Sequence, residues 1–351
     1  MRFVPTNCLR EGMVLGKTLL GENGQVLLSR GVEIKELYID KIRDIGYNGV
    51  YIKDEFTEEI YVSGIISDNL RVKTVQKLKE FSGTVGDENY LEIGGLQQCV
   101  EMIVDEILNN SNLMVNMIDL KVFDNYTFYH SVNVAVLSIV IGVGMGLSKQ
   151  KLYELGLAAL LHDIGKVFVP KEVLNKKGDL NDSEINIIRQ HTKIGYKYLK
   201  EKHDVPVQAY LGALQHHERY DGTGYPNQLY QNKISLFGRI ISVSDVYDAL
   251  TSDRPYRTAL SPSEGMEYIW GGGGTMFDPE IVEVFSKKVA PYPVGTKVRL
   301  SNGLFGVVLK NFEDSCIRPL LKVHDNGKTW KVNLRDRQWY DVTIEDIAKT
   351  G

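Results

Sequence analysis

The sequence predicts a mainly α-helical protein, in which a helical bundle is flanked by a small N-terminal α+β module and a small C-terminal β-rich module. Two observations lead to this prediction. Apolar residues recur at helical spacing through the middle of the chain, whereas both ends alternate short apolar runs with glycine-containing turns. We therefore divide the chain into four parts: an accessory module at 1–60, a helical linker or stalk at 61–118, a bundle at 119–290 and a β module at 291–351.

Length and composition are those of an ordinary soluble globular protein. The length of 351 residues is enough for more than one domain. Of these residues, 43% are hydrophobic and 25% are charged, which is typical of a soluble globular protein. The 41 basic and 45 acidic residues give a net charge of −4 without a long run of either sign. No basic face is therefore expected for a nucleic-acid polymer. A small charged ligand in a focused pocket remains compatible with this composition.

Cysteine usage and apolar segments indicate a cytoplasmic protein without a membrane span. Cys8, Cys99 and Cys316 are far apart and lack CxxC spacing, which implies a reducing compartment and no thiolate metal site. No basic segment followed by an apolar signal core opens the chain. The apolar stretch 131–147 contains polar residues and spaced glycines, so we interpret it as a buried core helix.

The part before the bundle has two patterns. In residues 1–60, turn signals and apolar runs predict a hairpin around 22–25, a helix over 34–45 and a strand at 50–52. The length and the lack of an acidic pocket argue against a phosphoacceptor receiver domain, and we assign this module a regulatory or dimerising role as a hypothesis. Helices are expected around 70–81 and over 96–109, either as a linker or dimer stalk or as an extension of the bundle.

Within the bundle, capping residues and apolar spacing predict five helices. They cover 124–144, 148–161 after the cap Ser148, a segment that Asp182 opens and that contains His191, a segment from Pro206 to the doublet 216–217, and 235–251. Antiparallel helices that point polar residues into a common core are how bundles build di-metal sites.

The chain after the bundle returns to strands. Gly271 to Gly274 are interpreted as a turn, because no P-loop lysine follows, and a last amphipathic helix ends near residue 289. Strands are expected at 297–300, 306–309, 320–323 and 330–332, as a small β appendage for which a barrel-like arrangement is one option.

Metal-competent side chains recur in the bundle. Five of the seven histidines lie on or at the end of apolar segments, where an unpaired imidazole is costly, and two aspartates accompany them: His130, His162, His191, His216, His217, Asp163 and Asp245. A lone histidine is usually a satisfied core or surface residue, and we interpret His203 and His324 as surface residues. The constellation of imidazole and carboxylate suits a first-row transition metal.

Several longer motifs accompany these residues. In chain order they are YTFYHS at 126–131, HDIGK at 162–166, HHERYDGTGYP at 216–226, DVYDAL at 245–250 and RPYR at 254–257. Together they resemble the HD-GYP domain, the bacterial subgroup of the HD phosphohydrolase superfamily, over about half of the chain. The resemblance implies an HD-type helical bundle with a two-metal site.

The resemblance also implies the role of each ligand. One metal would be bound by His130, His162, Asp163 and Asp245, the other by His191, His216 and His217, with Asp163 bridging both. A hydroxide shared by the two cations would attack a phosphodiester. Asp163 and Lys166 are the expected catalytic residues, and Lys166 would also contact a phosphate oxygen. The other expected substrate contacts are Gly224, Tyr225, Pro226, Arg254 and Arg257, although a structural salt-bridge role suits either arginine as well.

One departure from the family concerns the metals. Some members carry a glutamate one turn before the first metal histidine, where it helps to hold a third ion, and this chain has Tyr126 there. We therefore expect two divalent ions. The mixed shell suits iron or manganese, and the resemblance favours iron.

The implied activity is hydrolysis of cyclic di-GMP to pGpG, GMP or both. Two alternatives stay open: a cyclic-dinucleotide-binding signalling module with little turnover, and a hydrolase of another cyclic dinucleotide such as cyclic GMP-AMP. A different HD chemistry, such as nucleoside triphosphate hydrolysis or di-iron oxygenation, is disfavoured by the GYP loop. A homodimer and signalling protein partners are compatible with the terminal modules.

Overall fold

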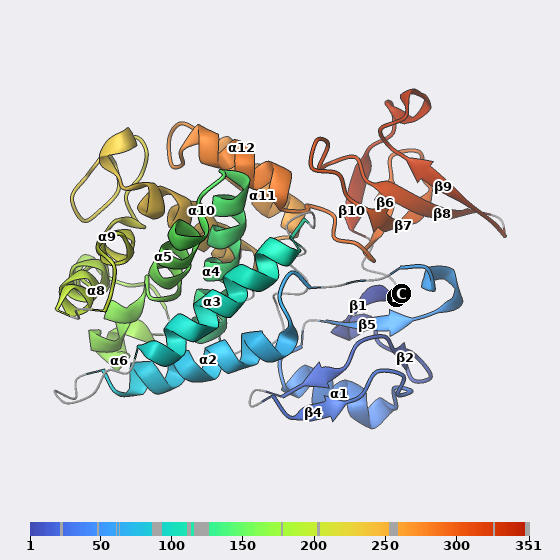
Figure 1. Ribbon diagram of the computed structural model, residues 1–351. Coiled ribbons are helices and arrows are strands. Elements are labelled where there is room, and N and C mark those ends of the chain that lie inside the picture. The colour runs from blue at the N-terminus through green and yellow to red at the C-terminus, as the bar shows by residue number, and fades with distance from the viewer. Residues whose placement is uncertain are drawn as a thin grey trace.

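The computed structural model describes residues 1–21, 24–47, 49–60, 62, 64–85, 93–110, 114–115, 126–176, 178–201, 204–252, 259–325 and 327–347. In this part of the chain, a large helical bundle lies beside two small β modules (Figure 1). The predicted mainly α fold class is confirmed.

The N-terminal module is a small sheet with one helix. Its strands β1 (Arg2–Pro5), β5 (Gly49–Lys53) and β2 (Val14–Leu15) pair antiparallel in the order β1-β5-β2. The strands β3 (Leu19–Leu20) and β4 (Val26–Leu28) form the predicted hairpin, and α1 (Glu36–Asp44) is the predicted helix. Val4, Leu15, Ile34 and Ile52 belong to a core that this module builds for itself.

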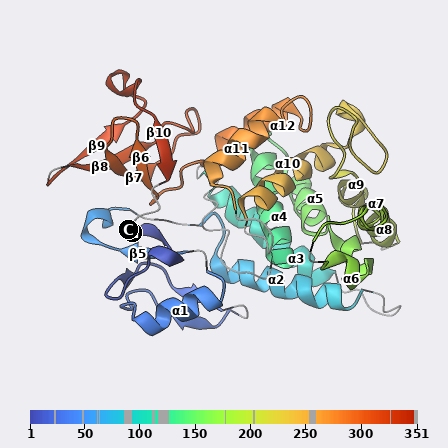
Figure 2. The ribbon, with the colours of Figure 1, turned by 180° about the vertical axis from the view of Figure 1, so that it is seen from behind.

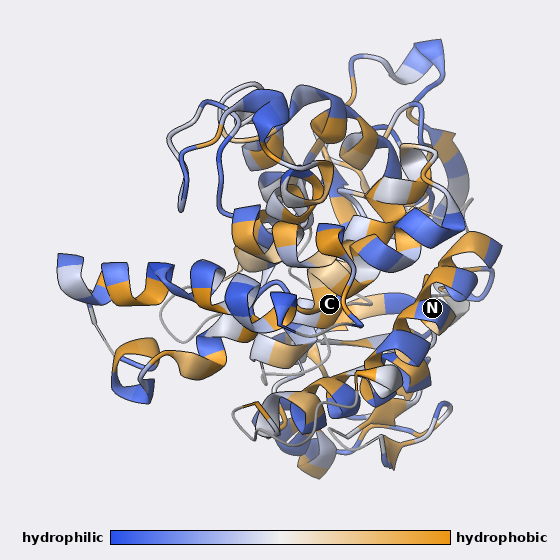
Figure 3. Cartoon of the chain, turned by 60° about the vertical axis from the view of Figure 1, so that its left-hand side comes forward, coloured by the Kyte–Doolittle hydropathy of each residue, from blue (hydrophilic) through white to orange (hydrophobic). Residues whose placement is uncertain are grey.

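The bundle consists of helices α2 to α12. Their bounds are α2 (Asp68–Gly83), α3 (Gly94–Asn109), α4 (Tyr126–Gly144), α5 (Lys149–Leu160), α6 (Lys171–Leu174), α7 (Asp182–Arg189), α8 (His191–Lys200), α9 (Val207–Gln215), α10 (Leu236–Thr251), α11 (Pro262–Gly271) and α12 (Pro279–Lys288). A short 3-10 helix, η4 (Ile164–Phe168), follows α5. The bundle helices carry both hydrophobic and hydrophilic segments (Figure 3).

A single hydrophobic cluster joins these helices. Leu70, Val75 and Val100 of α2 and α3 pack in the same cluster as Ile139 of α4 and Phe285 of α12. Helices α2 and α3, in the segment predicted as a linker or stalk or as an extension of the bundle, therefore share the core of the bundle. Most of the apolar residues of these two helices are buried within the chain, whereas Met102 and Leu108 of α3 are exposed.

Helix α4 forms the centre of the bundle. It is long and apolar enough to cross a membrane by length and composition, but 78% of the window Thr127–Gly144 is buried inside the structure. Burial against α5, α10 and α12 explains the apolar character of this helix without a bilayer. This agrees with the prediction of a core helix.

One predicted helix is wrong in its extent. The sequence suggested that the helix opened by Asp182 contains His191, but α7 ends at Arg189 and His191 is the first residue of α8. The helical ladder is interrupted at Gln190, whose N–H bonds to the carbonyl of Ile187. Local apolar spacing continues across this break, so periodicity alone does not reveal it.

The C-terminal module is an antiparallel sheet in the order β10-β6-β7-β8-β9. Its strands are β6 (Lys297–Leu300), β7 (Phe305–Lys310), β8 (Leu320–Asp325), β9 (Lys328–Asn333) and β10 (Ile344–Ile347). Within the described residues, β10 and β9 are unpaired edges, so the barrel-like closure is not observed. Two ion pairs join the terminal modules, from Glu59 to Lys322 at 3.1 Å and to Lys331 at 2.9 Å, and both modules lie on the same side of the bundle (Figure 2).

Candidate metal centre

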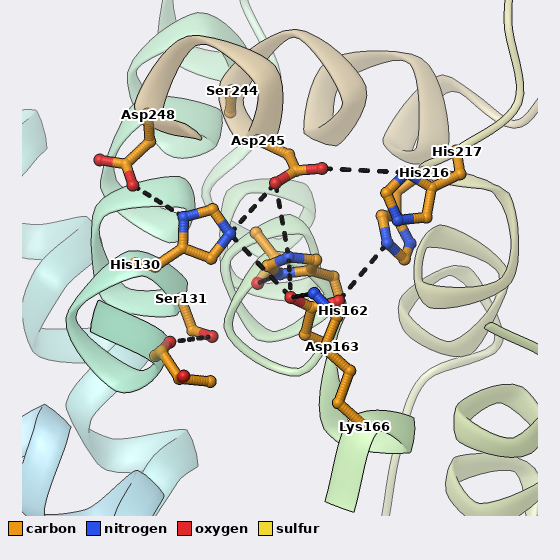
Figure 4. Close-up of polar contacts among 12 residues, drawn as sticks. His130, Ser131, His162, Asp163, Lys166, His216, His217, Ser244, Asp245 and Asp248 are labelled. Atoms are coloured by element: carbon orange, nitrogen blue, oxygen red, sulfur yellow. Dashed lines mark hydrogen bonds and ion pairs between the residues drawn. The ribbon is translucent and has the colours of Figure 1, made fainter. Parts of the chain in front are cut away.

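The helices of the bundle bring all seven predicted metal ligands together. Figure 4 labels these ligands except His191. His130 lies one turn into α4 and Asp245 lies in the middle of α10. His162 and Asp163 follow the end of α5, whose start is capped by the predicted Ser148. His191 opens α8, and His216 and His217 follow the end of α9. Helix ends and helix faces thus converge on one buried point.

The first group of donors is formed by His130, His162 and Asp245. His130 Nε2 lies 3.1 Å from Asp245 Oδ1, and His162 Nε2 lies 4.0 Å from the same oxygen. Asp163 Oδ2 faces this group as well, at 3.2 Å from His162 Nε2 and 4.0 Å from His130 Nε2.

The second group is formed by Asp163, His191, His216 and His217. Asp163 Oδ1 lies 3.4 Å from His191 Nε2 and 3.8 Å from His216 Nε2. The two carboxylate oxygens of Asp163 therefore face different groups of imidazoles. His217 of the second group also approaches the first group, with Nδ1 4.0 Å from Asp245 Oδ2.

Backbone contacts select the tautomer of three histidines. In each, Nδ1–H donates to the carbonyl three residues earlier: His162 to Ala159 at 2.7 Å, His191 to Ile188 at 2.7 Å and His216 to Ala213 at 2.8 Å. A carbonyl oxygen only accepts, so Nδ1 carries the proton and Nε2 is left with a lone pair. All three lone pairs point into the cluster, as metal binding requires.

These lone pairs need a positive partner. The Nε2 atoms of His191 and His216 are 3.4 Å apart, and two unprotonated nitrogens cannot hydrogen-bond to each other. Among the described residues, His162 Nε2 and Asp163 Oδ1 are buried without any hydrogen-bond partner. Buried orphan acceptors are costly. The residues present thus fit a cluster that binds metal ions.

Burial keeps the three imidazoles of the second group neutral. It lowers the pKa of His216 well below its usual value and lowers that of His217 to about 3. Burial alone would raise the pKa of Asp163, but the nearby His162 and Lys166 lower it overall. Neutral imidazoles and an ionised carboxylate are the protonation states that bind metal.

His130 differs because a carboxylate holds its other nitrogen. Its Nδ1 lies 2.7 Å from Asp248 Oδ2, and Asn133 Nδ2 donates to Asp248 Oδ1 at 3.0 Å. Burial would lower the pKa of His130, but the carboxylates of Asp245 and Asp248 raise it to about 9. Sequence reasoning gave Asp248 no role. Its position one helical turn after Asp245, inside a quoted motif, was the available signal.

Lys166 lies at the edge of the cluster. Its Nζ is 2.5 Å from Asp163 Oδ2, so the ammonium contacts the carboxylate that faces both groups. The neighbouring Gly165 allows η4 to approach α8 closely, since a Cβ at this position would collide with the carbonyl oxygen of His191. The glycine of the HDIGK motif is therefore explained by packing.

The loop after His217 places Tyr225 beside the metal ligands. The ring of Tyr225 stacks on His217 with centroids 4.7 Å apart, and the Arg189 guanidinium lies over the Tyr225 ring, 5.1 Å from its centroid. Glu218 is buried and accepts the N–H groups of Asn227 at 2.7 Å and of Leu229 at 3.0 Å. Sequence reasoning had assigned no role to Arg189 or Glu218.

The remaining predicted residues are placed as follows. Gly224 is buried, and a Cβ there would collide with the backbone of Glu218 and Arg219, while Pro226 follows Tyr225 through a cis peptide bond. Arg254 and Arg257 lie outside the described residues. His324 is exposed, as expected of a surface residue, whereas His203 lies outside the described part of the chain.

Comparison with known proteins adds to this geometry. A family model described as HD domain matches residues 106–281. A cyclic di-GMP phosphodiesterase of Pseudomonas aeruginosa is 42% identical over 254 residues, which cover 72% of this chain and 59% of that protein. A cyclic di-GMP phosphodiesterase of Thermotoga maritima is 38% identical over 185 residues, 52% of this chain and 48% of that protein.

One further relative is named for a different cyclic dinucleotide, and one solved structure shares the fold. A 3'3'-cGAMP-specific phosphodiesterase of Vibrio cholerae is 36% identical over 215 residues, 58% of this chain and 49% of that protein. Among solved structures, an HDGYP-type protein of Bdellovibrio bacteriovorus has a TM-score of 0.53 at 16% identity, covering 81% of this chain and 97% of that one. The chain thus spans less than two thirds of the sequence relatives named here and shares its fold with the solved protein.

Proposed function

Because this chain belongs to the HD domain family and carries the motifs of its HD-GYP group, we propose that it is a metal-dependent phosphodiesterase that hydrolyses cyclic di-GMP to pGpG, GMP or both. The observation that carries the proposal is the convergence of five histidines and two aspartates beside a loop that holds Tyr225. The names of two relatives, with 42% and 38% identity, support the choice of substrate.

Two divalent ions are proposed for the cluster, with iron first and manganese as the alternative. His130, His162, Asp163 and Asp245 would hold one ion, and His191, His216 and His217 the other, with Asp163 contacting both. When bound, such ions activate a water molecule and offset the charge that develops on the phosphate oxygens.

The side chains around the cluster would bind and orient the substrate. Lys166, as a point charge beside Asp163, would contact a non-bridging phosphate oxygen. The Tyr225 ring would stack on the ligand or its phenol would donate to it; burial raises the pKa of this phenol, so it stays protonated. Gly224 and Pro226 shape the loop, and Arg254 and Arg257 are proposed to contact guanine or phosphate.

The number of ions is itself testable. Tyr126 begins α4 at the position where a glutamate would help to hold a third ion, so we expect about two equivalents of metal per chain. Elemental analysis of protein purified without oxygen or chelators would measure this. A value close to three equivalents would contradict the proposal.

Turnover tests the activity directly. Iron- or manganese-loaded protein, purified anaerobically, should hydrolyse cyclic di-GMP, and Asp163→Ala should lower kcat by about a thousandfold or more, because both ion sites lose a ligand. Asp179→Ala, which changes an exposed aspartate of the same bundle, is the matched control and should retain the wild-type rate.

A substrate panel separates the alternatives. The Vibrio cholerae relative makes 3'3'-cGAMP the second substrate to test. Fully metallated protein that binds cyclic di-GMP without cleaving it would favour the binding-module function instead. Preferred cleavage of cGAMP would retain the chemistry and change the substrate.

We further propose that the protein acts in the cytoplasm, and that the terminal modules support a homodimer or bind signalling proteins. The proposal of a cytoplasmic location rests on the spacing of Cys8, Cys99 and Cys316, which are far apart in the sequence and lack a CxxC motif.

A further inference from the structure

A buried arginine from outside the matched family region reaches the surroundings of the metal cluster. Arg71 lies in α2, whereas the family model begins at residue 106. Its side chain is buried, and Nη1 donates to Asn133 Oδ1 at 2.9 Å. Burying a guanidinium is costly unless its hydrogen bonds are made, so its position inside the bundle calls for an explanation.

Hydrogen bonds connect Arg71 through Asn133 and Asp248 to the proposed metal ligand His130. Asn133 Nδ2 donates to Asp248 Oδ1 at 3.0 Å, and Asp248 Oδ2 lies 2.7 Å from His130 Nδ1. Four side chains from α2, α4 and α10 thus form one hydrogen-bonded series. All four are at most 4% exposed, so water does not compete for these bonds.

The direction of each bond sets the direction of the next. A guanidinium only donates, so Asn133 must turn its oxygen toward Arg71 and its NH2 toward Asp248. The opposite amide orientation would place a donor against Arg71 and an acceptor against the Asp248 carboxylate. Asp248 then accepts the Nδ1 proton of His130, which leaves Nε2 free to bind a metal.

We propose that Arg71 is a positioning residue for His130. By orienting the Asn133 amide, it holds Asp248 in place, and Asp248 holds the tautomer and ring orientation of His130. The proposal rests on the part of the proposed function that has His130 bind a metal ion. It makes α2 a component of the metal centre, although α2 supplies no ligand.

The test is a titration of the metal-free full-length protein with Mn²⁺. His130→Ala and His191→Ala first identify which of the two binding events belongs to each group of ligands. Arg71→Met keeps the apolar stem and removes the donors. We expect it to weaken the event that His130→Ala abolishes by about tenfold or more, and to change the other event less than about twofold.

Two controls separate positioning from general destabilisation. Arg71→Lys retains a donor for Asn133 and should recover most of the lost affinity. Val75→Ala removes buried apolar volume from α2 one turn after Arg71 but none of the hydrogen-bonding groups of the series, so it should lower the Tm without a selective loss of one ion. Equal weakening of both events by Arg71→Met, or selective weakening by Val75→Ala, would overturn the proposal.

Asn133→Leu provides a second route to the same answer if Arg71→Met does not fold. It should weaken the His130 event selectively, and adding Arg71→Met should cause no further loss, because Arg71 acts through Asn133. An unselective or additive result would contradict the proposal. Since the measurement uses Mn²⁺ alone, protein that binds two ions but cleaves no cyclic dinucleotide would contradict the proposed function without affecting this test.

Discussion

At the residue scale, four histidines of the cluster differ in the hydrogen-bond partner of Nδ1, the ring nitrogen that faces away from the cluster. Backbone carbonyls accept the Nδ1–H of His162, His191 and His216, and burial lowers the pKa of His191 and His216, so these last two rings stay neutral. His130 is held by Asp248 instead. Two buried carboxylates can stabilise a second proton on this ring, whereas a carbonyl cannot do so to the same degree. The two groups of ligands should therefore bind metal with different pH dependence.

Metal binding at the His130 group should release a proton. Asp245 and Asp248 raise the pKa of His130 to about 9, so in metal-free protein at pH 7.5 its Nε2 carries a proton that a metal must displace. Affinity at this group should rise with pH and level off above about pH 9. Metal binding at the second group should release few protons, because His217 has a pKa of about 3 and is already unprotonated. Calorimetric titration in two buffers of different ionisation enthalpy would measure about one released proton.

A buffer-independent heat at the His130 group would contradict this prediction. His130→Ala is the matched control, because it should abolish the proton release together with the binding event. His191→Ala should leave the release unchanged.

At the element scale, helix ends deliver most of the ligands. α5 and α9 end just before ligands, and α8 begins with one, so small shifts of these ends would separate donors from the cluster. The contact between η4 and α8 is the tightest of these arrangements, because Gly165 packs directly against the backbone of α8. The packing of one glycine thus determines where His191 stands relative to Asp163.

Replacing Gly165 should therefore damage the second group of ligands. A Cβ in Gly165→Ala would collide with the carbonyl of His191, which is backbone and cannot move aside as a side-chain tip can. We expect a loss of about 1–3 kcal/mol in the free energy of unfolding and weaker binding of the second ion. Denaturant unfolding and metal analysis would measure the two effects.

The matched control is Gly94→Ala, at the start of α3. Nothing lies within 4 Å of a Cβ at this position, so the substitution should be neutral or slightly stabilising. Unchanged stability and unchanged metal content in Gly165→Ala would show that η4 and α8 can separate without cost.

At the scale of the whole molecule, the terminal modules contact each other and the start of α2. Lys17 of the N-terminal module lies 3.1 Å from Asp68, the first residue of α2. Glu59 joins the same module to Lys322 and Lys331 of the C-terminal sheet. The N-terminal module is therefore linked to the helix that carries Arg71, three residues after Asp68. A ligand or partner that moves this module would act on α2 through the contact between Lys17 and Asp68.

Deleting residues 1–60 should change either the assembly of the protein or its rate. The deletion removes the contacts to α2 and uncovers the face of the C-terminal module around Lys322. Light scattering and turnover of cyclic di-GMP would measure the two properties. Glu59→Gln, which weakens only the contact between modules, separates that contact from the rest of the module. An unchanged mass and an unchanged rate after the deletion would exclude a regulatory or dimerising role.

The fold class, most helices and the set of candidate ligands could be predicted from the sequence alone. Apolar spacing and caps predicted α5 and α10, because these signals are local and act within a few residues. The ligands stood out because imidazole and carboxylate are rare in apolar segments. These properties require no knowledge of which surfaces meet.

The residues that surround the ligands become apparent only when the chain is folded. The break at Gln190, the contact of Gly165 with α8 and the series from Arg71 to His130 all depend on segments far apart in the chain. Arg71, Asn133 and Gln190 lie in none of the motifs found in the sequence, and the HDIGK motif does not reveal the contact of Gly165 with α8. Their roles arise from close packing and from the requirement that buried polar groups find partners, and both depend on how the helices are arranged in space.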